Sequence, residues 1–217
     1  MNLLIPSEKL KRFFSQFKTF HYKKGDVFLR SGDIPQGVYY IRTGYVRLYT
    51  LSLNGKELTL VIYKPGEFFP VVFTFTADPS VYNFETLSET TLFRAPRDKF
   101  INFINENEDV LKELTLHIIE RFQVALRRME YLTFGNAKSR LASVMVIYTK
   151  RLGERRGKST LIPIPLTHKD ISNLVGVARE TVSLEIKKFA DRGIINYKGK
   201  YIEIKNIKEL EREANLI

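Results

Sequence analysis

A long stretch without glycine or proline, residues 109–132, divides this chain of 217 residues into two parts of different character. Within it, a set of mainly apolar residues recurs at alternating spacings of four and three, the pattern of a coiled-coil seam on a helix. The seam consists of Leu111, Thr115, Ile118, Phe122, Ala125, Met129 and Leu132. Charged residues, Arg128 among them, occupy much of the remaining helix surface. Such a helix either packs within its own chain or pairs with its copy, and we expect it to form a two-fold homodimer interface.

The part before this helix has the character of an all-β domain. Between residues 20 and 93, short runs rich in β-branched and aromatic residues alternate with turn residues, as in a sandwich, barrel or jelly roll. Asn54-Gly55, between two alternating segments, predicts a two-residue hairpin turn. Four phenylalanines are expected in the core or in the wall of a pocket: Phe68, Phe69, Phe73 and Phe75.

The positive charge of the chain is concentrated after the long helix. The whole chain has a net charge of +11, and residues 133–217 hold 17 basic against 9 acidic residues, a net charge of +8. A uniformly basic surface would favour only solubility, whereas a local excess favours a polyanionic partner such as nucleic acid.

Several other classes of protein lack support in the sequence. Without cysteine the chain has no disulfide, no cysteine nucleophile and no cysteine-ligated iron–sulfur cluster. Its three histidines, His21, His117 and His168, lie far apart without metal-ligand spacing, and no catalytic constellation is recognisable, so we expect neither a metal site nor an enzyme. Haem ligation through His21 or His117 stays open. No apolar run is long enough for a membrane span, so we expect a cytoplasmic protein without a membrane partner.

Residues 166–195 have the pattern of two short helices joined by a tight turn. Thr167 and Asp170 have the spacing of a capping box, which predicts the start of the first helix. Gly176 suits the turn, and the second helix is expected over Ala178–Asp191. Helices in this arrangement form the helix-turn-helix motif, whose second helix enters the major groove of DNA.

The surroundings of this motif also fit a DNA-binding module. A further helix is expected over Asn136–Leu152, a basic loop over Gly153–Gly157, and a two-stranded wing around Lys198-Gly199-Lys200. The outward side of the second motif helix would carry Arg179, Glu180, Ser183, Leu184 and Lys187. Arginine suits guanine edges, glutamate accepts from cytosine, and serine serves either role. A generic helical hairpin is the alternative, but the glycine turn, polar face, wing and local charge together favour double-stranded DNA.

Over almost its whole length the chain resembles the bacterial cyclic-AMP-receptor/fumarate-nitrate-regulator (CRP/FNR) transcription factors. The most specific stretch is Leu166–Ile195, LTHKDISNLVGVARETVSLEIKKFADRGII, and Tyr39–Gly44 and Lys64–Phe69 resemble turns of the family's β-roll. The resemblance implies an α+β fold with three parts. These are an N-terminal β-roll (a double-stranded jelly roll of cyclic-nucleotide-binding type) over residues 1–108, a dimerisation helix over 109–134, and a winged helix-turn-helix over 135–217.

The resemblance also implies roles for individual residues. The positions that contact bases in the family fall on Arg179, Glu180, Ser183 and Leu184. Those expected to contact phosphates are Thr167, His168, Lys169, Thr181, Lys187 and Lys200. A homodimer on a palindromic promoter site is implied, with RNA polymerase as a partner. The loop Gly153–Ser159 and the hairpin near Asn54 are candidate polymerase contacts.

Two departures from the family pattern change what the resemblance implies. Cyclic-nucleotide-binding members hold the ribose with a glutamate and the cyclic phosphate with an arginine, but here the glutamate position is Val71, the arginine position is near Ser80, and Ala77–Phe84 contains no arginine. An unpaired phosphate in a partly buried site is strongly unfavourable, so we expect no useful binding of cyclic AMP and no cofactor. Leu184 stands where most members have an arginine, which predicts a shifted half-site. A sensor of a cyclic nucleotide or other ligand, and a constitutive regulator controlled by its abundance, both stay open.

Overall fold

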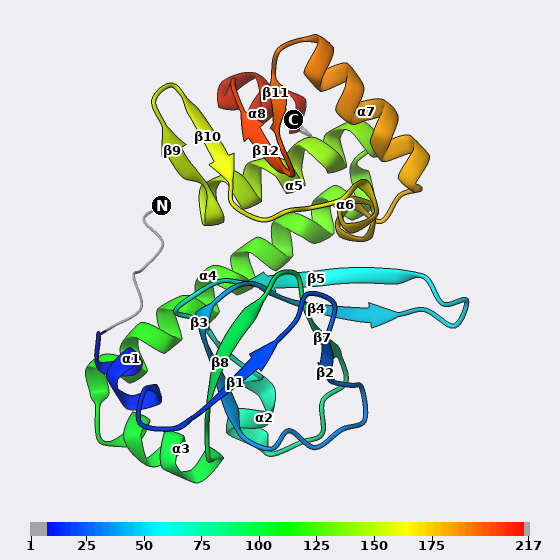
Figure 1. Cartoon of the computed structure of the whole chain (residues 1–217). Helices are drawn as coiled ribbons and strands as arrows, with labels where there is room; N and C mark the ends of the chain where they lie inside the picture. Colours follow the sequence, from blue (N-terminus) through cyan, green and yellow to red (C-terminus); the bar gives the residue numbers. More distant parts are fainter. Residues whose placement is uncertain (1–7, 215–217) are drawn as a thin grey trace. The chain divides into compact units, whose positions relative to one another are not determined.

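The computed structural model describes residues 8–214 of the chain. The chain forms two compact units, residues 1–120 and 121–217, and the division falls inside the long helix α4 (Glu108–Phe134) (Figure 1). The helix expected over residues 109–132 is confirmed with slightly wider bounds. The domain boundaries expected at residues 108 and 134 correspond to the ends of this helix and stay predictions.

The first unit is built around two antiparallel four-stranded sheets. One has the order β1-β8-β3-β6, with β1 (Lys18–Tyr22), β8 (Thr90–Ala95), β3 (Val38–Thr43) and β6 (Phe68–Phe69). The other has the order β2-β7-β4-β5, with β2 (Val27–Leu29), β7 (Asn83–Thr86), β4 (Val46–Leu51) and β5 (Glu57–Tyr63). Three helices complete the first part of the chain: α1 (Glu8–Phe14), α2 (Val71–Thr76) and α3 (Arg97–Asn105). The expected β-roll is therefore confirmed.

Aromatic side chains fill the centre of the β-roll. Phe69 is fully buried and stacks on Phe84 at 5.1 Å between ring centroids, and Tyr63 and Tyr39 pack against the same cluster. Three of the four expected core phenylalanines, Phe68, Phe69 and Phe73, are buried. The prediction for Phe75 is wrong, because its side chain is 43% exposed. Phe73 and Phe75 lie two residues apart on α2, and residues at that spacing face opposite sides of a helix.

The hairpin formed by β4 and β5 projects from the roll and confirms the chain reversal predicted near Asn54 (Figure 1). Its connection is longer than the predicted two-residue turn, because the strands end at Leu51 and begin again at Glu57. Ser52 and Lys56 close this wider loop. The Ser52 N–H donates to the Lys56 carbonyl oxygen at 2.9 Å, and the Ser52 hydroxyl oxygen accepts from the Lys56 N–H at 3.0 Å.

The second unit is a winged helix-turn-helix. Its helices are α5 (Ala137–Leu152), α6 (His168–Val175), α7 (Arg179–Asp191) and α8 (Ile207–Ala214). Its antiparallel sheet has the order β11-β12-β10-β9, with β11 (Ile195–Lys198), β12 (Tyr201–Ile204), β10 (Ser159–Ile162) and β9 (Glu154–Arg156). The core lies between the helices and contains Leu141, Met145, Phe189 and Leu210. No helix within residues 8–214 is both long and apolar enough to cross a bilayer.

The basic loop expected over Gly153–Gly157 is partly wrong, because Glu154–Arg156 form strand β9. It pairs antiparallel with β10, Glu154 lying opposite Leu161 and Arg156 opposite Ser159. A left-handed Gly157, at φ +60°, makes the reversal between the two strands possible. The sequence did not predict this strand, because its three residues are all charged and lack the apolar alternation typical of strands. All three side chains are exposed at the edge of the sheet.

Candidate nucleic-acid interface

The helix-turn-helix forms where the sequence predicted it. Thr167 caps α6 in a full capping box: its hydroxyl oxygen accepts from the Asp170 N–H, and the Asp170 carboxylate accepts from the Thr167 N–H at 2.8 Å. Gly176 ends α6 in the left-handed conformation at φ 72°, which a glycine adopts without strain. These two local signals set the length of α6 and the start of the turn into α7.

Helix α7 separates a buried face from an exposed face. Val182, Ile186 and Phe189 are at most 3% exposed and attach the helix to the core. The four residues expected to contact bases lie on the other side, where Arg179 and Glu180 are exposed, Leu184 is 61% exposed, and Ser183 is half-buried. The structure thus brings the four residues together on one surface, and their contact with bases stays a prediction.

The residues expected to contact phosphates lie at the start of α6, on α7 and in the β11–β12 wing. Lys169 and Lys187 are exposed, Thr181 is half-buried, and Lys200 lies at the tip of the β11–β12 wing beside Gly199. The Thr167 hydroxyl already donates to Asp170 at 2.7 Å. Exposed lysines are thus present on α6, on α7 and at the wing tip, and exposed cations of this kind can bind a phosphate backbone.

His168, expected at a phosphate, is the exception in this set. Its Nδ1 lies 2.7 Å from the Ser183 hydroxyl oxygen, and its Nε2 lies 2.9 Å from the Tyr197 hydroxyl oxygen. Both ring nitrogens are thus engaged inside the module. The sequence did not predict a role for Tyr197, because no local pattern connects residues that lie 29 positions apart in the chain.

Two arginines fix the end of α4 to the helix-turn-helix within the second unit. The Arg128 guanidinium is buried and donates from Nη2 to the Leu174 carbonyl oxygen at the end of α6, at 2.7 Å. Burial lowers the pKa of Arg128. The Arg140 guanidinium donates to the Gly135 and Leu132 carbonyl oxygens, at 2.8 and 2.7 Å. The expectation that Arg128 belongs to the charged surface of α4 is therefore wrong.

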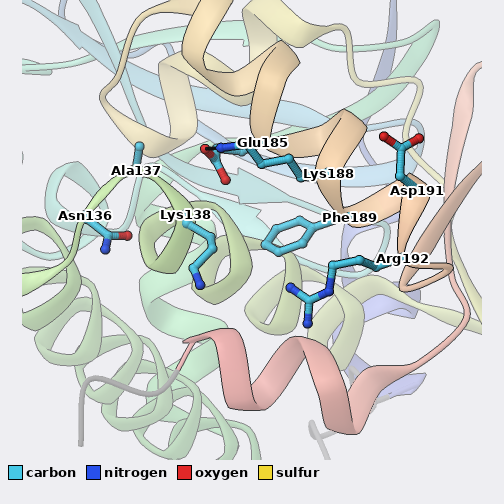
Figure 2. A pocket seen from close by; sticks show the side chains of 8 residues that line it. All are labelled: Asn136, Ala137, Lys138, Glu185, Lys188, Phe189, Asp191 and Arg192. Carbon is cyan, nitrogen blue, oxygen red and sulfur yellow. Dashed lines mark hydrogen bonds and ion pairs between the residues drawn. The ribbon is translucent and has the colours of Figure 1, made fainter.

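A recess lies between the start of α5 and the second half of α7 (Figure 2). Its volume is about 680 Å³, and its lining residues are Asn136, Ala137, Lys138, Glu185, Lys188, Phe189, Asp191 and Arg192. The three cations in it already have carboxylate partners: Lys188 pairs with Glu185 at 2.7 Å, Lys138 with Glu213 at 2.6 Å, and Arg192 with Glu209 at 2.7 Å. The recess is accordingly a region where ion pairs join α5, α7 and α8.

In the β-roll, the two positions that the family resemblance aligned with cyclic-nucleotide contacts, Val71 and Ser80, carry no charge. Val71, at the start of α2, is half-buried against an apolar cluster. Ser80 donates from its hydroxyl to the Tyr82 carbonyl oxygen at 2.7 Å, and its backbone pairs with Gly32 and Asp33. These residues do not fit a ribose and a cyclic phosphate, because neither supplies the carboxylate or the cation that those groups need.

The histidines do not converge on a metal site. His21 Nδ1 lies 3.2 Å from the Thr91 hydroxyl oxygen, and within residues 8–214 no three histidine, aspartate or glutamate side chains gather closely enough to hold a metal ion.

Comparison with known proteins identifies both units. Residues 19–107 match the family profile of the cyclic nucleotide-binding domain, and residues 139–213 match that of the Crp-like helix-turn-helix domain. A β-roll of this type joined through a long helix to this reading domain defines a class of DNA-binding transcription regulators. Within that class, the chain belongs to the CRP/FNR family.

The similar proteins extend over nearly the whole chain. The transcriptional regulator SdrP of Thermus thermophilus is 30% identical over 201 residues, which cover 89% of this chain and 94% of SdrP. The CRP-like cAMP-activated global transcriptional regulator of Mycobacterium tuberculosis is 25% identical over 199 residues, covering 92% of this chain and 89% of that protein. The crystal structure of a CRP/FNR-family transcriptional regulator from Thermus thermophilus superposes with a TM-score of 0.71 at 27% identity, covering 91% of this chain and 98% of that one.

Proposed function

We propose that this chain is a homodimeric, sequence-specific regulator that binds a palindromic promoter site through α7 and does not use cyclic AMP. The observation that carries the proposal is the outward face of α7, where Arg179, Glu180, Ser183 and Leu184 lie together, with exposed lysines on α6, α7 and the wing. An arginine and a glutamate on one helix face discriminate between base pairs, whereas the lysines supply affinity without sequence preference.

The apolar seam on α4 supports the homodimer. Leu111, Ile118, Phe122 and Met129 are between 41% and 62% exposed, Thr115 and Ala125 are also exposed, and Leu132 is half-buried. A row of this length is costly to leave in water, and its four-three spacing matches a second copy of the same helix. Two copies related by a two-fold axis would present two α7 helices to two half-sites of a palindrome.

Two further surfaces are candidates for RNA polymerase. The exposed β9–β10 hairpin carries Arg155 and Arg156, and the β4–β5 hairpin ends in the fully exposed Leu53. Each hairpin projects from its own unit, which suits contact with a protein partner at a promoter. The proposed activity requires no catalysis and takes place on the chromosome in the cytoplasm.

Selection from a random pool of double-stranded DNA tests the proposal, followed by measurement of affinity for the selected sites. We expect a two-fold symmetric consensus whose half-site differs from the common family half-site at the base pair next to Leu184, because an apolar side chain suits a thymine methyl group. A purified chain that enriches no sequence would contradict the proposal.

The first prediction concerns cyclic AMP. Since Val71 and Ser80 supply neither a carboxylate for the ribose nor a cation for the phosphate, isothermal titration calorimetry should detect no binding at micromolar nucleotide. Micromolar binding of cyclic AMP in the calorimeter would contradict this part of the proposal.

The aromatic core around Phe69 and Phe84 favours a regulator controlled by its abundance over a sensor of another small ligand.

A further inference from the structure

One histidine joins three elements of the winged helix-turn-helix: α6, α7 and the wing strand β11. His168 is the first residue of α6, where the capping box of Thr167 and Asp170 fixes its backbone. Its Nδ1 meets Ser183 on α7 at 2.7 Å, and its Nε2 meets Tyr197 on the wing strand β11 at 2.9 Å. The two partners come from the helix expected to read bases and from the strand leading to the wing tip.

The direction of the hydrogen bonds follows from the hydrogens available. The Ser183 hydroxyl donates its single hydrogen to the Arg179 carbonyl oxygen at 2.9 Å, so toward His168 it acts as an acceptor. In the tautomer that fits this acceptor the ring hydrogen is on Nδ1, and Nε2 accepts from the Tyr197 hydroxyl. The hydrogen bonds then run from the Tyr197 hydroxyl through His168 and Ser183 to the Arg179 carbonyl oxygen as the final acceptor.

The environment of Tyr197 supports its role as the first donor. The side chain is half-buried and lies on the same face of β11 as the buried Ile195. Burial raises the pKa of Tyr197, so its hydroxyl keeps its hydrogen at neutral pH. Lys198 follows directly and opens the turn that carries Lys200, so the bond to His168 also fixes the base of the wing.

This network determines what Ser183 can offer to a base. With its hydrogen on Arg179 and one lone pair on His168, the hydroxyl oxygen keeps one lone pair for a ligand. A lone pair in the major groove matches the exocyclic amino group of adenine or cytosine, and not the carbonyl oxygens of guanine or thymine.

We infer that His168 is a positioning residue that holds the Ser183 hydroxyl in the orientation of an acceptor for an adenine or cytosine amino group and joins the wing to the recognition helix. The inference rests on the proposed function, because it concerns how α7 reads a site. It replaces the phosphate contact expected for His168, which would have to break one of two short hydrogen bonds within the module.

The experiment measures affinities for half-sites with each of the four bases at each position. Ser183→Ala first identifies the base pair that Ser183 reads, as the position where preference for an amino group falls about fivefold or more. We expect His168→Phe to reduce the preference at the same base pair, and the double variant to lose no more than either single variant. Tyr197→Phe removes only one hydroxyl, and should weaken that preference in part.

Tyr201→Phe is the matched control, because Tyr201 lies on the other wing strand and is 38% exposed. It should leave all base preferences unchanged. Thermal unfolding of every variant separates a loss of the fold from a loss of selectivity, and Tyr197→Phe keeps the test decisive if His168→Phe unfolds.

Three results would overturn the inference. The first is an equal loss of binding on all sequences in His168→Phe and Tyr197→Phe, which would assign His168 to a phosphate or to the fold alone. The second is a preference for guanine or thymine at the position that Ser183 contacts, and the third is a Ser183→Ala variant with every base preference unchanged. A wild-type chain without any sequence preference would instead contradict the proposed function itself.

Discussion

Arg179 is the residue whose substitution should change DNA recognition most directly. Its side chain is exposed at the first turn of α7, and its backbone is held by the helix, so it can be removed without loss of packing. Arg179→Ala should lower affinity for the selected site by about 1–3 kcal/mol and relax a single base position. Binding to a panel of single-base variants measures both effects. An equal loss on every sequence would make Arg179 a phosphate contact.

Arg47 is the residue of the β-roll whose substitution should lower the stability of the fold most directly. It lies on β4 with its side chain 7% exposed, paired with Glu57 on β5 at 2.7 Å and with Glu85 on β7 at 2.6 Å, and its guanidinium stacks over Tyr49 at 4.2 Å. Arg47→Met would leave two carboxylates partly buried without their cation. The unfolding free energy should fall by about 3–5 kcal/mol, which urea denaturation measures. Arg30→Met, on an exposed arginine of the same roll, should change it little.

Among the elements, α8 is joined to its neighbours by ion pairs in addition to the packing of its buried Leu210. Glu213 on α8 pairs with Lys138 on α5 and with Arg192 after α7, and the hydrogen bonds from these two cations lower the pKa of Glu213 below its ordinary value of 4.5. A carboxylate whose pKa is lower in the folded state adds stability above its unfolded pKa, and this stability is lost as the pH falls through the folded pKa.

Glu213→Gln should therefore lower the unfolding free energy at pH 7 and make it less dependent on pH below about 4.5, where the wild type loses stability. Urea denaturation at a series of pH values checks this. Glu211→Gln, on the same helix but in a more exposed pair with Lys150, is the control and should keep the wild-type profile. If Glu213→Gln keeps the wild-type dependence of the unfolding free energy on pH, the ion pairs of Glu213 do not contribute to stability.

The elements also differ in how far the sequence predicts them. The capping box at Thr167, the turn at Gly176 and the helical state of α4 depend on neighbouring residues, so the local sequence predicted them. Strand β9 was missed because its residues are all charged, although its partner β10 follows directly in the chain. The outward position of Phe75 was missed because the phase of a short helix decides it. The contacts of Arg128 and Tyr197 carry no local signal, since their partners lie 46 and 29 residues away in the chain.

For the whole molecule, the proposed dimer is the property that a single substitution can remove. Phe122 is 62% exposed in the middle of the α4 seam, so Phe122→Glu would bury two like charges against each other across a two-fold axis. The dissociation constant of the dimer should rise by about 100-fold or more, as measured by analytical ultracentrifugation, and affinity for the full palindrome should fall with it. Leu53→Glu, at the fully exposed tip of the β4–β5 hairpin, should leave both unchanged. A Phe122→Glu chain that stays dimeric would move the interface elsewhere.

The joint between α4 and the reading module depends on two guanidinium groups that bind the carbonyl ends of helices, Arg140 at α4 and Arg128 at α6. Burial lowers the pKa of Arg128, but from so high a starting value that the group stays charged in any living cell. Acidification of the surroundings therefore leaves this joint intact. A bacterium growing under acid stress would keep these two hydrogen bonds, so the carboxylate pairs of α8 would weaken before this joint does.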